Sequence, residues 1–463
     1  MIKILITVLL LVVLTIGIRK GYNITTLLIF LGSTALLCYT LITGQSVAGA
    51  TSGSNFFDVF ELFVETFKSR FSAMLIITMT VIGYTSYMNH IGASKALADV
   101  LTKPISKVKN KYLLLSLTVL VVFLMIFAIP SPTSVIMLLF GTLVPILVSV
   151  GVPIEGICAS MVAASVIVSG PSNPHTLLAT AELGVMDSMD IATFAFSKQI
   201  FIAIISCIVM MVLCPISNYI FDKRDNVVGR PDLQLSGEAS YNGPVAPKFY
   251  AIFPVLPLTL VVIFSKLIAG SISISVVCAQ FVGLIAVMII NKFVARKSFL
   301  DSFGDTAKFY AGMGGYIGSQ GMIPVAGAYF AAAIAKIGGL DIIVGKLSDM
   351  GLGFGGMMFL VGLMAAVCSF ITADSMGSLS IVLPVAITVV KAAVTTNPNA
   401  AIIGAIILLQ APVFGSCTSI VFPSTLMLSS LTDVTIPTIV KRNILPAIGA
   451  IIVLVVSTFV FIH

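Results

Sequence analysis

Ser169-Gly170-Pro171-Ser172-Asn173-Pro174-His175 interrupts an otherwise apolar stretch of the chain, residues 154–188. The stretch is longer than the roughly 20 residues that one membrane-spanning helix needs. Two prolines and a glycine within seven residues end a helix at this point. A helix broken at membrane depth leaves backbone N–H and C=O groups without partners, and such groups cannot face lipid. The segment therefore predicts a polar site inside a membrane protein.

Three other apolar stretches carry a comparable polar break. The breaks are Ile129–Ser134 in residues 112–151, Thr372–Ser378 in residues 355–391, and Phe414–Ser419 in residues 399–432. Thr133 and Asn173 are 40 residues apart, and Ser375 and Cys417 are 42 residues apart. We interpret 112–151 and 355–391 as re-entrant hairpins and 154–188 and 399–432 as broken helices. Each half of the chain then contains a hairpin followed by a broken helix.

The composition supports a membrane location for the whole chain. Of 463 residues, 58% are hydrophobic and 9% are charged, whereas a soluble globular chain carries about 25% charged residues. This excludes a soluble enzyme, a disordered chain and a nucleic-acid binder. The seven cysteines lack C-x-x-C spacing, which argues against a zinc site or a disulfide framework. Besides the two hairpins, spans are expected near 4–18, 24–43, 71–89, 154–188, 199–221, 249–268, 272–291, 316–335, 399–432 and 438–462.

The distribution of basic residues predicts the orientation. With the N-terminus outside, 17 of the 25 Lys and Arg residues lie on the cytoplasmic side, as the positive-inside rule requires. The polar segment 222–248 is then a cytoplasmic linker, and both termini are periplasmic. Because each half has about five crossings, an odd number, the second half is inserted upside down. The predicted fold is an all-α polytopic membrane protein with two inverted-topology repeats, residues 1–221 and 249–463.

The residue types at the breaks indicate what they bind. N-termini of half-helices carry a partial positive charge that suits a carboxylate, and carbonyl oxygens at C-termini suit Na⁺. No Arg or Lys lies in any break, so helix dipoles, hydroxyls and amides must hold a small anion. The candidate substrate-binding residues are Ser131, Thr133, Ser134, Ser172, Asn173, His175, Thr176, Ser375, Ser378, Ser416, Thr418 and Ser419.

Two titratable residues lie in the breaks. Asp374 is the only acid there, and a carboxylate inside the membrane usually has a function. It can bind Na⁺ together with Asn173 and Thr133, carry a proton, or cap the half-helix 376–390. His175 can hydrogen-bond substrate, titrate, or serve only in capping and packing. The coupling ion is thus Na⁺ or H⁺, and no organic cofactor is expected.

These features favour a secondary carrier for a small organic anion. An enzyme would need a nucleophile–base pair or a metal cluster, and three well-separated His residues with no acid cluster provide neither. Three alternatives remain: a carrier for citrate or an amino acid, a cation/proton antiporter, and a channel.

Several sequence strings resemble those of a known family. They are Tyr87–Ser94 followed by Lys103-Pro104, Phe221–Asp225, Ala246–Pro254, and Val440–Arg442 before Pro446. Their order and spacing resemble the anaerobic C4-dicarboxylate carriers of the DcuC type, within the ion transporter superfamily. The resemblance departs at Thr372–Ser378, where that family typically has Gly-Ser-Gly-Asn-Ala-Pro and this chain carries Asp374.

The resemblance implies a carrier of the bacterial inner membrane. It implies exchange, uptake or export of dicarboxylates such as succinate and fumarate, with coupling to Na⁺ or H⁺ in related members. It also implies a homodimer in which a transport region moves against a scaffold in an elevator mechanism, with the bilayer and the organic anion as the other partners.

Overall fold

The computed structural model describes residues 2–20, 22–47, 52–105, 108–230, 244, 246–264, 274–338, 342, 349, 352–372, 375–420 and 422–461. Within these ranges all regular structure is helical. The first half contains α1 (Ile2–Arg19), α2 (Ile24–Thr43), α3 (Asn55–Arg70), η1 (Phe71–Leu75), α4 (Ile76–His90), α5 (Ala93–Thr102), α6 (Lys111–Ala128), α7 (Pro132–Thr142), α8 (Val144–Ser149), α9 (Ile154–Ser165), α10 (Pro174–Glu182), η3 (Val185–Asp187), α11 (Ile191–Phe194), η4 (Ala195–Gln199) and α12 (Ile200–Arg224).

The second half follows the 222–248 segment. It contains η5 (Lys248–Val255), α13 (Leu256–Ile263), α14 (Val276–Val294), α15 (Phe299–Asp305), α16 (Ala307–Tyr316), η6 (Ile317–Gly321), α17 (Met322–Ile337), α19 (Phe354–Thr372), α20 (Ser375–Ala393), α21 (Ala400–Cys417), α22 (Pro423–Thr432) and α23 (Ile436–Phe461). Six helices of the described residues are long and apolar enough to cross a membrane. The chain is therefore a multi-pass membrane protein.

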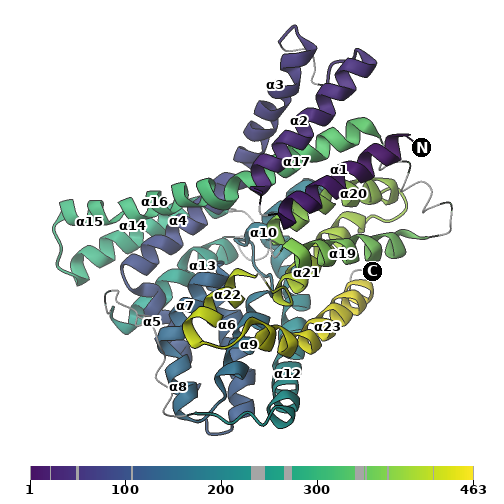
Figure 1. The fold of residues 1–463 in the computed structure, drawn as a ribbon. Helices are drawn as coiled ribbons and strands as arrows, with labels where there is room; N and C mark the ends of the chain where they lie inside the picture. Colours follow the sequence, from purple (N-terminus) through teal and green to yellow (C-terminus); the bar gives the residue numbers. More distant parts are fainter. Residues whose placement is uncertain are drawn as a thin grey trace.

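The helices form a body with two protruding arms (Figure 1). In the body, α6, α9 and α12 of the first half pack with α19, α20, α21 and α23 of the second half around one large apolar core. Helices α2 and α3 project from it together, and α4 runs beside α14 and α16 in a second arm. Helix α10, which follows the break of the first broken helix, lies near the centre of the molecule. The candidate site is thus surrounded by helices of both halves.

The breaks lie close to their predicted places, with shorter limits at the two hairpins. The sequence predicts an interruption of the first broken helix at 169–175, and the structure interrupts it earlier, at 166–173, because Pro174 and His175 already belong to α10. At the first hairpin α7 already begins at Pro132, and at the second α20 begins at Ser375. The N–H groups of the first turn of a helix have no partner within the helix, so proline, which lacks an N–H, loses nothing there. Pro132, Pro174 and Pro423 each begin a helix for this reason.

The last break differs from its prediction at 414–419. Helix α21 continues to Cys417, so the interruption covers 418–422. Gly415 lies inside the helix because α19 passes against it: a Cβ at Gly415 would collide with the carbonyl oxygen of Ala366. The glycine allows close helix packing at this position rather than ending the helix.

The arms of the second hairpin are longer than the half-helices that the sequence suggested. Helices α19 and α20 have 19 residues each, which corresponds to about 28 Å at 1.5 Å per residue. This length is close to the hydrocarbon thickness of a bilayer, about 30 Å. Helix α6, at 18 residues, is similar, whereas α7 and α8 divide the second arm of the first hairpin into short pieces.

A buried ion pair joins the last helices of the two halves. The Nη1 atom of Arg442 on α23 lies 2.7 Å from Oδ1 of Asp222 and 2.8 Å from Oδ1 of Asn218, both on α12. Arg442 is fully buried and the Asp222 side chain is 4% exposed. Loss of one partner of such a pair leaves an uncompensated buried charge. The pair therefore fixes how α12 and α23 cross.

We expect Gly415→Ala to destabilise the fold by about 1–3 kcal/mol, because the added methyl group overpacks the α19–α21 contact. Thermal unfolding of the purified protein in detergent measures the effect. Gly314→Ala on α16 is the matched control, since no atom lies within 4 Å of its added Cβ. Equal melting temperatures for the two variants would contradict the proposed role of Gly415.

Candidate functional site

The first broken helix and the second hairpin meet through one hydrogen bond. Nε2 of His175, at the start of α10, lies 2.7 Å from Oγ of Ser375, the first residue of α20. The two residues are 200 positions apart in the chain. Two helix N-termini from different halves therefore face each other at this point.

The protonation of His175 follows from its second contact. Oδ1 of Asn173 accepts the backbone N–H of His175 at 3.0 Å, which identifies that atom as the amide oxygen. The same oxygen lies 3.2 Å from Nδ1 of His175, and because it can only accept, Nδ1 carries the proton. In the tautomer with this single ring proton, Nε2 accepts a hydrogen bond from the Ser375 hydroxyl. A second proton on the ring would force Ser375 to accept instead.

A backbone carbonyl at the first broken helix is held by glutamines from both halves. The carbonyl oxygen of Val168 accepts Nε2 of Gln199 at 3.2 Å and Nε2 of Gln410 at 3.0 Å. Gln199 precedes α12, Gln410 lies on α21, and both side chains are buried. Within a bilayer an unpaired carbonyl is costly, so the two amides stabilise the irregular backbone at 166–173.

The other breaks are connected to this centre. Ser369 on α19 and Ser416 on α21 are joined by a short hydrogen bond between their hydroxyl groups. Gly170, at φ +94°, faces the Phe127 ring. A Cβ added at Gly170 would lie 3.4 Å from the nearest carbon of that ring. Phe127 lies on α6 next to the break of the first hairpin. All four breaks thus lie in one connected region.

The arrangement suits a small anion. Both α10 and α20 begin at the His175–Ser375 contact, and a helix N-terminus carries a partial positive charge. Among the described residues at or next to the first broken helix, α21 and the last break, three buried polar atoms lack a hydrogen-bond partner: Oγ of Ser169, Oε1 of Gln410 and Oγ of Ser419. Hydroxyl groups and amide oxygens of this kind can bind a substrate or a cation.

The structure brings some of the predicted site residues together and leaves others apart. His175, Ser375 and Ser416 take part in contacts between segments from different breaks, and Asn173 holds His175 within its own break. Ser131 donates to Ser134 at 2.8 Å within the first hairpin, and Thr133 beside them is exposed. Asp374 lies outside the described residues.

The remaining predicted residues have local surroundings. Thr176 is buried and accepts Nε2 of Gln199 at 2.9 Å. Thr418 donates to the carbonyl of Gly415 at 3.0 Å. Ser378 is buried on α20, and Ser172 is partly buried in the first broken helix.

Three contributors were missed from the sequence: Gln199, Gln410 and Ser369. All three lie within helical segments rather than at breaks, so a search for interruptions passes over them. A signal was present for Gln410, a polar side chain in the apolar run 400–414, because such residues in membrane helices face the protein interior. Among the described residues no three His, Cys, Asp or Glu side chains group as metal ligands.

We expect Gln199→Met and Gln410→Met to cost about 1 kcal/mol each in stability, since one amide donor still holds the Val168 carbonyl. The double variant should lose clearly more than the sum, because it leaves that carbonyl unpaired. Thermal unfolding in detergent measures all three. Strict additivity would show that the two amides do not share one acceptor.

Comparison with known proteins agrees with this architecture. A family model described as DcuC, C4-dicarboxylate anaerobic carrier, matches residues 2–463. The anaerobic C4-dicarboxylate transporter DcuC of Escherichia coli is 26% identical over 450 residues, covering 95% of this chain and 92% of that protein. A probable anaerobic C4-dicarboxylate transporter DcuC of Vibrio cholerae is 28% identical over 358 residues, 75% of this chain and 74% of that protein.

Two solved structures share the fold. The YdaH transporter of Alcanivorax borkumensis is 14% identical with a TM-score of 0.64, covering 95% of this chain and 98% of that one. MtrF of Neisseria gonorrhoeae, described with a class of antimetabolite efflux pumps, is 12% identical with a TM-score of 0.54, covering 99% and 95%. Since the family model spans nearly every residue, the chain belongs to the DcuC family of C4-dicarboxylate anaerobic carriers.

Proposed function

We propose that this chain is a secondary carrier that moves C4-dicarboxylates such as succinate or fumarate across the bacterial inner membrane. The observation that carries the proposal is the His175–Ser375 hydrogen bond, which joins two helix N-termini from different halves at membrane depth. Family membership supports the substrate class, because both curated relatives are C4-dicarboxylate transporters by name.

The proposed binding mode follows from the charge of the substrate. A C4-dicarboxylate carries two carboxylates, and two positive helix ends, those of α10 and α20, begin at the site. The partial positive charge at each end attracts one carboxylate. Hydroxyl groups at the breaks provide further donors without placing a fixed positive charge in the membrane. A site of this kind can release its substrate, as a carrier must.

The two hairpins and two broken helices are proposed to form inverted-topology repeats. The order of helical hairpin, broken helix and long final helix occurs in both halves, ending in α12 and α23. In such carriers one bundle moves around a site near the bilayer midplane. We propose an elevator movement in which the body of the molecule, with both hairpins and both broken helices, carries the site past α2, α3 and α17, in each protomer of a homodimer.

Counterflow in proteoliposomes tests the transport function. Vesicles preloaded with unlabelled succinate should accumulate labelled succinate transiently above the external level, and fumarate inside should drive the same accumulation. Citrate and amino acids inside should not. Labelled succinate that only equilibrates would indicate a channel, and counterflow driven by citrate or an amino acid alone would replace the substrate class.

We expect Ser375→Ala to reduce succinate counterflow about tenfold, because His175 and the α20 N-terminus lose the hydroxyl that joins them. Ser380→Ala is the matched control: Ser380 is buried on the same helix, but its hydroxyl donates to the carbonyl of Met376 on the same helix at 3.0 Å. Equal activity of the two variants would remove Ser375 from the site.

The coupling ion is proposed to bind at Asp374, with Asn173 and Thr133 as further ligands in the case of Na⁺. Asp374→Asn should abolish the dependence of uptake on Na⁺ or pH while leaving exchange measurable. Uptake measured against an imposed Na⁺ or proton gradient tests this. An unchanged dependence would assign the coupling to another group, and His175 is then the next candidate.

A further inference from the structure

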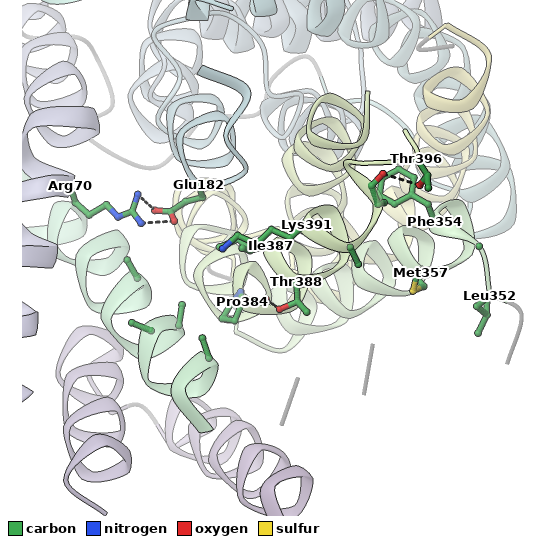
Figure 2. Close-up of a pocket in the computed structure, with 17 residues that line it drawn as sticks. Arg70, Glu182, Leu352, Phe354, Met357, Pro384, Ile387, Thr388, Lys391 and Thr396 are labelled. Carbon is green, nitrogen blue, oxygen red and sulfur yellow. Dashed lines mark hydrogen bonds and ion pairs between the residues drawn. The ribbon is translucent and has the colours of Figure 1, made fainter. Parts of the chain in front are cut away.

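A cavity of about 1010 Å³ lies apart from the four breaks. One wall is α17, which presents only alanines to it: Ala328, Ala331, Ala332 and Ala335. The opposite wall is the second half of α20, from Pro384 to Ala393, and the first turn of α19 completes it (Figure 2). Short side chains on α17 leave the space open where bulkier residues would fill it.

Three charged side chains line this cavity. Arg70 at the end of α3 holds Glu182 at the end of α10 in a two-point contact, with Nη1–Oε1 and Nη2–Oε2 distances of 2.6 and 2.7 Å. The Glu182 side chain is only 5% exposed. Lys391, on α20, extends its amine toward this pair (Figure 2). Two cations and one carboxylate leave the lining with a net positive charge.

Neither Arg70 nor Lys391 has all of its hydrogen-bond donors paired within the described residues. Nε of Arg70 is buried and has no hydrogen-bond partner among the described residues. Lys391 is exposed, and the ion pairs of the described residues do not include it. A carboxylate that enters the cavity therefore meets the ammonium group of Lys391 and the guanidinium of Arg70, whose side chain is 23% exposed beside Glu182. Charged donors of this kind strengthen hydrogen bonds to anions.

Two helices extend from the central site to the cavity. Helix α10 runs from His175 at the site to Glu182 at the cavity, about 10 Å along its axis. Helix α20 runs from Ser375 at the site past Pro384, about 14 Å away, to Lys391, about 24 Å away. Both helices thus connect the two places, and the cavity lies at their C-terminal ends, so the attraction of an anion there depends on Lys391 and Arg70.

The orientation inferred from the basic residues places this cavity on the outer side. Arg70 and Lys391 are among the eight basic residues that do not follow the positive-inside rule. The structure brings these two exceptions to one cavity. A function in attracting an anion from the outside gives a physical reason for their departure from the rule.

We propose that this cavity is the outer vestibule of the carrier and contains an accessory anion-binding site, in which Lys391 and Arg70 bind one carboxylate of the incoming dicarboxylate. Glu182 orients Arg70 and limits the net charge, so that the anion is held weakly and passes on to the central site. The substrate class rests on the proposed function, whereas the positive vestibule rests on the cavity and its charges.

A chemical test examines the vestibule without using transport. The parent protein has its exposed cysteines, Cys38 and Cys278, replaced by serine, and Ala331→Cys is introduced into this parent. Intact cells that express it are treated with a membrane-impermeant methanethiosulfonate reagent, either anionic or cationic. The thiol should react from outside, and the ratio of anionic to cationic rates should fall about two- to fourfold in Lys391→Gln. Lys336→Gln is the matched control, because Lys336 is exposed on α17 but does not line the cavity. No reaction above the parent, or an unchanged ratio, overturns the vestibule.

A kinetic test examines the ligand. In succinate uptake, Lys391→Gln should raise KM about three- to tenfold at low salt with kcat unchanged, and Lys336→Gln should leave both unchanged. A fall in kcat with constant KM would overturn the accessory site. If the wild-type protein shows no succinate counterflow while the reagent ratio behaves as expected, the proposed substrate is wrong and the anion vestibule stands.

Discussion

The carbonyl of Val168 shows the constraint on which the rest of the structure depends. A chain that crosses a bilayer must satisfy its backbone hydrogen bonds internally, and this one interrupts its helices at four places. The carbonyl accepts amides from Gln199 and Gln410, so one break is stabilised by both halves at once. The same requirement brings the breaks together, since they can satisfy one another only in a shared interior.

This requirement also shapes the chemistry of the site. Among the described residues its polar groups are hydroxyls, amides and one histidine, with no lysine or arginine, and Asp374, which lies outside them, is the acid predicted there. A fixed charge at membrane depth is costly. The positive ends of α10 and α20 supply attraction for an anion without an ionised side chain. The full cations lie elsewhere: Arg442 is paired with Asp222 at the α12–α23 crossing, and Arg70 and Lys391 line the large cavity. In the proposed mechanism, the cations of the cavity attract the anion and the central site, which has no lysine or arginine at its breaks, binds it.

Part of the site could be predicted because helix interruption is a local property. Pro171, Pro174 and Gly170 determine a break by their own backbone preferences, and Asn173 caps α10 through a contact two residues away. Gly415 shows the limit of this reasoning. Glycine serves equally to end a helix and to let another helix approach, and the passage of α19 at Ala366 decides between these roles. No residue near Gly415 in sequence carries that information.

The sequence by itself determined the membrane class, the approximate bounds of several long helices, the approximate places of the breaks and the residue types that they offer, because hydropathy, proline and glycine act over a few neighbouring residues. Only the tertiary structure decided that His175 faces Ser375, 200 residues away, that Gln410 reaches Val168, and that Arg70 and Lys391 share a cavity with Glu182. These contacts arise from the packing of helices from both halves. Their partners are chosen by the three-dimensional arrangement, which no local spacing specifies.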